Sequence, residues 1–312
     1  MKIIYPQKNT EKTRSATIGF FDGVHLGHRF VMEQLKKTAE KNNASSLIIT
    51  FDAHPRKVIR SDFQPKLLTT LPEKLKLFNK TGVDACAVLD FTPEMAQLPA
   101  YDFMKQVLKE QYNVGTLLIG YDHRFGKNRQ ETFEQYVEYG KMLGIELVLL
   151  ERFSSREPEN ISSSEIRRAL QNGEISRANA MLGYDYFFEG QVIDGFKIGR
   201  KIGFPTANLL LNEQEKLLPA VGVYAVKILA DGEIYPGMLN IGNRPTLENG
   251  NRISIEAHII DFDKDIYNQT IEVSFLHKIR DERKFDSVDK LIEQLTKDKE
   301  EVLATLQTLE PQ

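Results

Sequence analysis

The 312-residue sequence has only one cysteine, Cys86, and it lacks long apolar runs. A single thiol cannot form an internal disulfide, and no cysteine or histidine stands near it at metal-ligand spacing. Without a long apolar run we expect no transmembrane helix, and residues 1–15 lack the apolar core of a signal peptide. We therefore expect Cys86 to be a buried strand residue and the protein to be cytoplasmic.

The sequence also lacks an excess of charge of either sign. Lysine and arginine number 41 and aspartate and glutamate 44, which gives a net charge of −3 and a pI near 6.1. This balance predicts neither a nucleic-acid partner nor a membrane-surface partner, although a local basic pocket could still bind phosphate. Hydrophobic residues make up 41% and charged residues 27%, which is typical of a globular protein with one large domain or two ordinary ones.

The first half of the chain alternates short apolar segments with amphipathic ones. We predict strands at 15–21, 45–51, 85–91, 115–120 and 145–150, and helices at 28–43, 100–112 and 131–144. Nearly continuous apolar strands separated by helices predict an α/β fold, a parallel sheet covered on both faces. Ligands of such sheets bind beyond the carboxyl ends of the strands, where we expect the polar segments 21–28, 52–56 and 121–127 to meet.

The segment TIGFFDGVHLGH, residues 17–28, predicts a strand, a glycine-containing turn and the start of a helix. A helix N-terminus presents free N–H groups and the positive end of a dipole, so it suits phosphate. His25 and His28 stand around Gly27 at this point, and imidazoles can donate to phosphate oxygens. The motif favours nucleotide chemistry at the phosphate itself. A turn with two exposed histidines is the alternative.

Three further segments carry polar residues that suit a nucleotide. Asp52, His54 and Arg56 follow the second predicted strand, although alone they are typical of a polar loop. A second loop carries Asp122, His123, Arg124, Lys127 and Arg129. In ISSSEIRRAL, Ser162 and Glu165 have capping-box spacing, and Ser162, Ser163 and Arg167 at a helix N-terminus would also suit a triphosphate.

The second half has a different rhythm. Two short helices are predicted around Asn172–Gly173, and beyond Tyr184 the helical periodicity gives way to apparent strands at 186–195, 221–232, 235–242, 252–262 and 270–280. Turn signals between several of them predict an antiparallel sheet or small barrel, followed by an amphipathic helix at 287–309. We place the domain boundary near residue 183, giving domains 1–183 and 184–312.

The segment DGFKIGRKIGFPTANL has glycines at 195, 199 and 203 and matches neither a P-loop nor a dinucleotide fingerprint. Glycines at this spacing are also found in bulges and bends. Thr206 and Asn208 place two neutral oxygens on one strand face, which would suit a Mg²⁺-nucleotide. Glu256 interrupts an apolar strand and shares a face with Ser254 and His258. A solvent-facing glutamate is the alternative for Glu256.

These segments together resemble the prokaryotic bifunctional riboflavin kinase/FAD synthetase family over essentially the whole chain. GFFDGVHLGH, TFDAHP, GYDHRFG and ISSSEIR resemble its FMN adenylyltransferase module. GRKIGFPTANL, PAVGVYAV, GMLNIGNRPT, IEAHIIDFD and the IRDERKF segment resemble its riboflavin kinase module. The resemblance implies a Rossmann-like nucleotidyltransferase domain followed by a six-stranded flavokinase barrel.

The resemblance also implies roles for individual residues. His25 and His28 would contact ATP phosphates and stabilise charge at the α-phosphorus, and Glu256 would take the proton of the ribityl 5′-hydroxyl. Thr206 and Asn208 would hold Mg²⁺ with ATP, and Arg280 would bind the flavin from a closing loop. The implied nucleotide-binding residues are Phe20, Asp22, Gly23, Asp52, Asp122, Ser162, Ser163, Arg167, Gly199, Arg200, Gly203, Pro205 and Thr206.

The implied reactions phosphorylate riboflavin to FMN and adenylylate FMN to FAD with release of pyrophosphate, both with ATP. Tyr121, His123 and Glu131 depart from the family pattern, so a kinase with a weak or lost adenylyltransferase half is one alternative. A non-catalytic flavin-binding regulator is another, but it would be expected to lack His28, Asn208 or Glu256. The sequence leaves self-association open.

Overall fold

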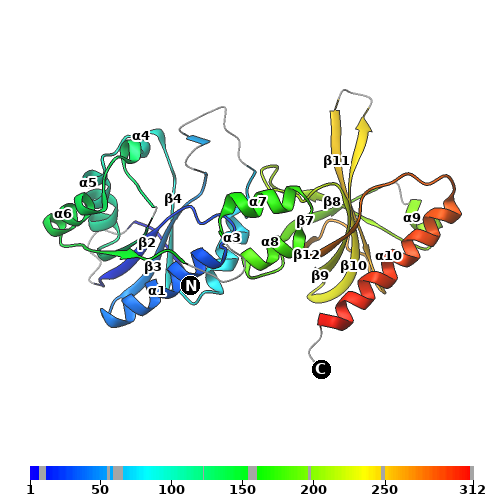
Figure 1. The fold of residues 1–312 in the computed structure, drawn as a ribbon, viewed down its shortest axis with the longest axis horizontal. Helices are drawn as coiled ribbons and strands as arrows, with labels where there is room; N and C mark the ends of the chain where they lie inside the picture. The colour runs from blue at the N-terminus through cyan, green and yellow to red at the C-terminus, as the bar shows by residue number, and fades with distance from the viewer. Residues whose placement is uncertain are drawn as a thin grey trace. The chain divides into compact units, whose positions relative to one another are not determined.

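The computed structural model describes residues 1–6, 12–54, 57–58, 66–121, 123–153, 160–195, 198–246 and 250–309. Two residues singled out from the sequence, Arg56 and Asp122, lie outside these ranges. The chain forms two compact units, Met1–Ile161 and Ser162–Gln312. Each unit is traced by colour in Figure 1, the first from blue to green and the second from green to red. In the described parts of the chain, no helix is both long and apolar enough to cross a membrane.

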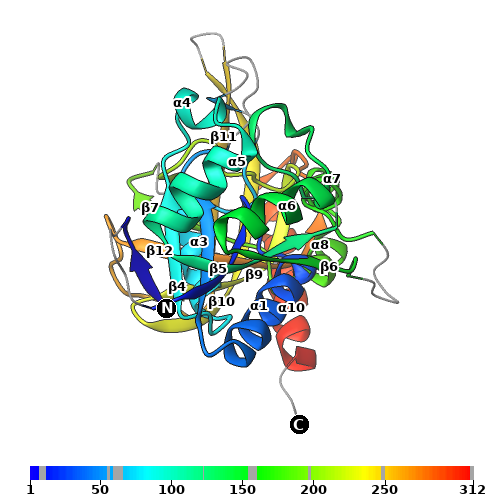
Figure 2. The ribbon, with the colours of Figure 1, turned by 90° about the vertical axis from the view of Figure 1, so that its left-hand side faces the viewer.

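The described part of the first unit is built on a six-stranded parallel sheet, which confirms the predicted α/β class (Figure 2). Its order is β1-β4-β3-β2-β5-β6. Every residue of the central strand β3 is buried, as expected of a strand inside a covered parallel sheet. The strands are β1 (Lys2–Ile4), β2 (Arg14–Ile18), β3 (Ser45–Phe51), β4 (Ala85–Leu89), β5 (Val114–Gly120) and β6 (Glu146–Leu150).

The helices of this unit alternate with its strands, as predicted. Its α-helices are α1 (Leu26–Lys41), α3 (Leu71–Asn79), α4 (Pro93–Ala96), α5 (Ala100–Phe103) and α6 (Phe133–Leu143). Residues 104–111, predicted as ordinary helix, form a π-helix. Helices α3 and α4 and the short edge strand β1 were not predicted from the sequence. Cys86 is buried in β4, as expected.

The strand order fixes where a ligand site can form. Strands β3 and β4 follow β2 to one side, whereas β5 and β6 lie on its other side. The chain therefore reverses its direction of travel between β2 and β5, and this switch point is where α/β sheets bind ligands. The three polar segments follow the neighbouring strands β2, β3 and β5, so they start from the same edge of the sheet, as predicted.

The described part of the second unit contains a closed barrel of order β10-β11-β8-β7-β12-β9, with every pairing antiparallel. This confirms the small barrel. Its strands are β7 (Phe187–Ile193), β8 (Ala207–Leu211), β9 (Gly222–Ala230), β10 (Glu233–Thr246), β11 (Gly250–Ile259) and β12 (Thr270–Arg280). The short helix α9 (Ile198–Lys201) precedes β8, and α10 (Val288–Leu309) ends the unit.

Helix α10 lies beside the barrel in Figure 1 and closes a small core there. Val302 of α10 is buried in a cluster with Met238 and Leu276, on which Leu295 also packs. The predicted C-terminal helix therefore covers one side of the barrel, as the sequence indicated.

Helices α7 (Ser163–Gln171) and α8 (Ile175–Leu182) also belong to the second unit. Asn179 of α8 donates to the carbonyl of Phe275 at 2.9 Å and accepts from the N–H of Tyr186 at 2.8 Å. Ile175, Ala178, Met181 and Leu182 bury the apolar face of this helix. Both helices lie before residue 183, where the sequence predicts the boundary between the two domains. That boundary stays a prediction.

These contacts predict that a fragment of residues 162–312 is more stable than one of residues 184–312. The shorter fragment lacks the buried face of α8 and both hydrogen bonds of Asn179. We expect its melting temperature to be lower by roughly 5 °C or more, measured by circular dichroism. Equal melting temperatures would show that α8 adds nothing to the barrel.

Candidate functional sites

A tight turn joins β2 to α1 and positions the two histidines of the first unit. Strand β2 ends at Ile18, three residues earlier than predicted, because Phe21 adopts a positive φ of 53° and breaks the extended backbone. Gly23 has φ 81° and Val24 has φ 38° in the same turn. A side chain at Gly19 would collide with the ring of Phe21, since an added Cβ would come within 2.8 Å of it.

The carboxylate of Asp22 holds this turn in place. It accepts from the backbone N–H groups of Leu68 and Thr69 at 3.1 and 3.0 Å, and the N–H of Gly23 donates to the Thr69 hydroxyl at 3.1 Å. Asp22 and Gly23 were predicted to bind nucleotide. In the structure their described contacts fasten the turn to the segment that leads into α3.

The imidazoles of His25 and His28 stack at the N-terminus of α1. Their ring centres are 3.6 Å apart with an angle of 18° between the planes. His25 is the N-cap, and its Nδ1 accepts from the N–H of His28 at 3.3 Å. A neutral His25 therefore carries its proton on Nε2, which leaves it a donor. Nδ1 of His28 is buried without a hydrogen-bond partner among the described residues.

Burial keeps both imidazoles neutral. It lowers the pKa of His25 to about 4. The pKa of His28 lies well below its ordinary value, first because of burial and further because a proton there would be repelled by the Lys74 ammonium and would compete with protons on His25 and His123. Two neutral rings at a helix N-terminus form a site that can donate to an anion and can tolerate charge developing on it.

The other described candidates of the first unit lie in the segments that follow β2, β3 and β5. Phe20 packs edge-on against His54 with ring centres 4.7 Å apart. Asp52 is exposed at the end of β3, where it accepts from the N–H of Ala53 at 2.6 Å. The ring of His123 lies 6.4 Å from that of Phe125, in the loop after β5.

The predicted residues Ser162, Ser163 and Arg167 begin helix α7, which belongs to the second unit. Ser162 caps the helix by accepting from the N–H of Glu165 at 3.2 Å. Of the predicted capping box, the hydrogen bond from the N–H of Glu165 to the Ser162 hydroxyl is formed. The carboxylate of Glu165 accepts from Arg168 and Arg177.

Lys74 of α3 is a residue of the first site that the sequence analysis missed. It is buried, and its Nζ donates to the carbonyls of Phe20 and Phe51, each at 3.1 Å. A signal was present, because position 74 falls on the apolar face of the helix with Leu71, Leu77 and Phe78. A lysine on an apolar face needs polar partners, and here these are the carbonyls of Phe20 and Phe51.

In the barrel, three polar side chains form a row across neighbouring strands. Glu256 of β11 is paired with Asn208 of β8 on one side and with Asn240 of β10 on the other. Directly opposed residues point to the same face of a sheet, and all three line one pocket of about 380 Å³. Glu256 is half-buried and faces this pocket. Asn240 was missed, although it interrupts an apolar strand just as Glu256 does.

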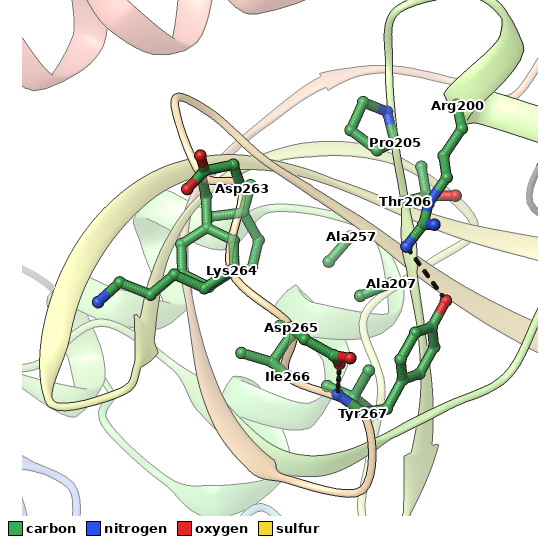
Figure 3. A pocket seen from close by; sticks show the side chains of 13 residues that line it. Arg200, Pro205, Thr206, Ala207, Ala257, Asp263, Lys264, Asp265, Ile266 and Tyr267 are labelled. Atoms are coloured by element: carbon green, nitrogen blue, oxygen red, sulfur yellow. Dashed lines mark hydrogen bonds between the residues drawn. The ribbon is translucent and has the colours of Figure 1, made fainter.

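Two pockets of the barrel meet at Thr206. The Glu256 pocket is lined by Asn208, Asn240, Glu256 and Arg280 and by apolar residues that include Met238, Phe285, Leu291 and Leu295. The Tyr267 pocket, of about 390 Å³, is lined by Arg200, Pro205, Thr206, Lys264 and Tyr267 among others (Figure 3). Thr206 lines both. Thr206 is therefore a wall of both pockets.

The glycines of the segment before β8 each have a physical reason. A Cβ at Gly195 would lie 1.9 Å from Nδ2 of Asn208, and a Cβ at Gly199 would lie 2.1 Å from the carbonyl of Phe204. Gly203 adopts φ +82° and lies outside the lining of both pockets. Gly199 lines the Glu256 pocket. Gly195 and Gly199 thus allow neighbouring atoms to approach the backbone closely, and Gly203 allows the chain to turn.

His258 fixes the Thr206 segment from the next strand. It is buried, and its Nδ1–H donates to the carbonyl of Pro205 at 2.7 Å. Burial lowers the pKa of His258, so the ring remains neutral. In Figure 3 Arg200 reaches across the Tyr267 pocket, where it donates to the Tyr267 hydroxyl at 3.4 Å.

Arg280 was predicted to bind the flavin from a closing loop, but it is the last residue of strand β12 and its guanidinium is held by an ion pair. It lines the Glu256 pocket but donates to both carboxylate oxygens of Asp298 on α10, at 3.0 and 2.8 Å to Oδ2 and 3.2 Å to Oδ1. Asp298 is fully buried and also accepts from Gln294 at 2.6 Å. Arg280 thus joins the end of β12 to α10.

Known proteins resemble this chain along nearly all its length. Residues 7–165 match the family model described as FAD synthetase, and residues 182–306 match the one described as riboflavin kinase. A bifunctional riboflavin kinase/FMN adenylyltransferase of Listeria monocytogenes is 37% identical over 96% of this chain and 95% of its own. The protein of that name from Haemophilus influenzae is 41% identical over 91% of each chain.

A solved structure shares the fold of the whole chain. It is titled as a macrolide-efflux protein from Streptococcus pneumoniae, and it is 31% identical with a TM-score of 0.87. It covers 96% of this chain and 97% of its own. The two units thus define a nucleotidyltransferase-like domain joined to a flavokinase barrel. The chain belongs to the family of bifunctional riboflavin kinase/FMN adenylyltransferases.

The geometry of His25 predicts that acid destabilises the first unit. The folded state holds the pKa of His25 at about 4, below the ordinary 6.5, so the unfolded chain binds the proton more readily. Its contribution is complete above pH 6.5 and is lost as the pH falls toward 4. The loss amounts to about 3 kcal/mol.

The matched variant is His25→Asn, because asparagine can cap α1 but does not titrate. Urea unfolding at pH 7 and pH 4, followed on the amide NMR signals of α1, measures the effect. We expect the variant to lose about 3 kcal/mol less than the wild type between the two pH values. The same loss in both proteins would contradict the role assigned to His25.

Proposed function

We propose that the chain phosphorylates riboflavin to FMN at the barrel and adenylylates FMN to FAD at the parallel sheet, each time with ATP. The observation that carries the proposal is the pairing of two separate sites, each built in the unit that matches the corresponding family model. The imidazole pair lies at a helix N-terminus. The row of Asn208, Glu256 and Asn240 lines the Glu256 pocket, which shares Thr206 with the Tyr267 pocket.

At the first site the neutral imidazoles of His25 and His28 contact the phosphates of ATP. The phosphate of FMN attacks the α-phosphorus in line, and the bond to pyrophosphate breaks. The ring donors and the N–H groups at the start of α1 stabilise the charge that develops on the α-phosphate oxygens. Such a transfer depends on positioning and electrostatics, and no covalent intermediate with the protein is needed.

The other predicted nucleotide-binding residues keep their proposed roles. Phe20 and Asp52 stand near the ends of β2 and β3, where the nucleotide would lie. Asp122 comes two residues after β5 in the sequence. Ser162, Ser163 and Arg167 are candidates in the second unit, and their hydroxyls and guanidinium suit a triphosphate.

At the second site the chemistry of each pocket indicates its occupant. The Tyr267 pocket offers the cations of Arg200 and Lys264 for phosphates and aromatic rings for a base, so we assign it to ATP. The Glu256 pocket has an apolar wall for a flavin ring and the polar row for a ribityl chain. Glu256 takes the proton of the 5′-hydroxyl as that oxygen attacks the γ-phosphorus, and ADP leaves.

We propose that Mg²⁺ accompanies ATP at the second site. Among the described residues no group of three His, Cys, Asp or Glu side chains is arranged to hold a metal ion unaided. Mg²⁺ in nucleotide sites uses few protein oxygens together with phosphates and waters, so the side chains of Thr206 and Asn208 fit that need. When bound, the ion would neutralise phosphate charge. A cytoplasmic location is likewise proposed, in keeping with ATP as co-substrate.

Glu256→Gln should remove the base of the kinase while keeping the shape of the side chain. We expect FMN formation from riboflavin to fall by about a hundred- to ten-thousand-fold. FAD formation from supplied FMN should stay near the wild-type rate. Chromatographic separation of riboflavin, FMN and FAD measures both. Glu233→Gln, at an exposed position of β10, serves as the control, and kinase activity within a few-fold of wild type in Glu256→Gln would overturn the assignment.

His28→Ala should have the reciprocal effect. Loss of a preorganised donor typically costs about a hundredfold or more in turnover, so FAD synthesis should fall by that factor. Riboflavin phosphorylation should persist, because its residues lie in the other unit. An unchanged rate of FAD synthesis would remove His28 from the mechanism. Loss of both activities in a folded variant would show that the two sites depend on each other.

A further inference from the structure

Lys74 is a fully buried lysine with no assigned role in the proposed chemistry. It belongs to α3, which begins with a complete capping box between Thr70 and Glu73. Only 1% of Lys74 is exposed. Burying an ammonium group is costly unless polar partners compensate for the lost water. Lys74 therefore needs such partners in the folded protein.

Those partners are the ends of two neighbouring strands. Nζ donates to the carbonyl of Phe20, just beyond β2, and to the carbonyl of Phe51, the last residue of β3, each at 3.1 Å. It also lies 4.0 Å from the centre of the Phe20 ring, a cation–π contact. Phe20 leads directly into the turn that carries the histidines, and Phe51 is followed by Asp52. One ammonium group thus joins both loops.

The charge of Lys74 also acts on the imidazole pair. It is one of the causes that keep the pKa of His28 low, together with burial, His25 and His123. The pKa of His25 is set by burial and by a hydrogen bond of its own backbone. Lys74 therefore affects the pKa of His28 and not that of His25. Burial lowers the pKa of Lys74 itself to about 8, opposed by the charges of Asp22 and Asp52.

We propose that Lys74 is a positioning residue of the adenylyltransferase site, whose ammonium ties the ends of β2 and β3 together and supplies positive potential beside His28. The inference rests on the proposed transfer of an adenylyl group at this site. A fixed cation at this sheet edge would favour the transition state, in which negative charge shifts onto the leaving pyrophosphate, more than it favours ATP binding.

The test compares Lys74→Met, which removes the charge at similar length, with Lys74→Arg, which keeps a charge that does not titrate. Lys76→Met is the matched control, because Lys76 is an exposed lysine on the same helix. FAD synthesis from FMN and ATP is measured from pH 6 to pH 10. Imidazole NMR signals follow the titration of His25 and His28 in each protein.

In Lys74→Met we expect kcat to fall by about tenfold to a hundredfold, with a smaller change in KM for ATP. The His28 titration should move to higher pH while that of His25 stays in place, because loosening of the whole turn would move both. The wild type and Lys76→Met should lose activity above about pH 8. Lys74→Arg should lack that alkaline decline and retain more activity than Lys74→Met.

An unchanged kcat in Lys74→Met, or joint movement of both histidine titrations, would overturn the inference. If Lys74→Met does not fold, the comparison of wild type with Lys74→Arg decides, since an identical alkaline decline in the two proteins would also overturn it. A wild-type protein that makes no FAD would instead refute the proposed function. The two failures are therefore distinguishable.

Discussion

The carboxylate of Asp22 is the contact on which the first site depends. By accepting from the backbone of Leu68 and Thr69, it fastens the turn after β2 to the segment that starts α3. On one side of this contact the chain leads to the stacked imidazoles, and on the other to Lys74. The Asp22 carboxylate, with its two N–H donors, thus fixes both the neutral imidazoles and the Lys74 ammonium at the same edge of the sheet. Its strength lies in organising the other groups.

The barrel reaches a comparable result by strand register. Asn208, Glu256 and Asn240 come from three strands, and each is brought level with the next by continuous antiparallel pairing. A slip of one residue would turn Glu256 away from the pocket, so the hydrogen-bond ladder itself determines the polar row. His258 and Arg280 then secure the neighbouring segments, one through the carbonyl of Pro205 and the other through Asp298.

Much of this architecture was readable from the sequence, because strand–helix alternation and strand–turn spacing are local patterns. The parallel sheet, the barrel and the meeting of three loops at one edge are confirmed. The early end of β2 was missed, since the positive φ of Phe21 follows from tertiary contacts in the turn. The partners of Lys74, Phe20 and Phe51, lie 54 and 23 positions away in the sequence, and Asp298 lies 18 positions from Arg280. Local sequence patterns do not reveal pairs at such separations. Individual catalytic roles stay predictions.

The close approach of Gly195 to Asn208 bears on how this protein can vary. Any side chain at position 195 would occupy the space of the Asn208 amide, since even a Cβ would lie 1.9 Å from Nδ2. The position has no side chain to offer a substrate, yet a substitution there would displace a residue of the polar row. Mutational tolerance at Gly195 is therefore set by the needs of a neighbouring strand. In a mutational scan such a glycine would be indistinguishable from a catalytic residue, although it contributes only the absence of a side chain.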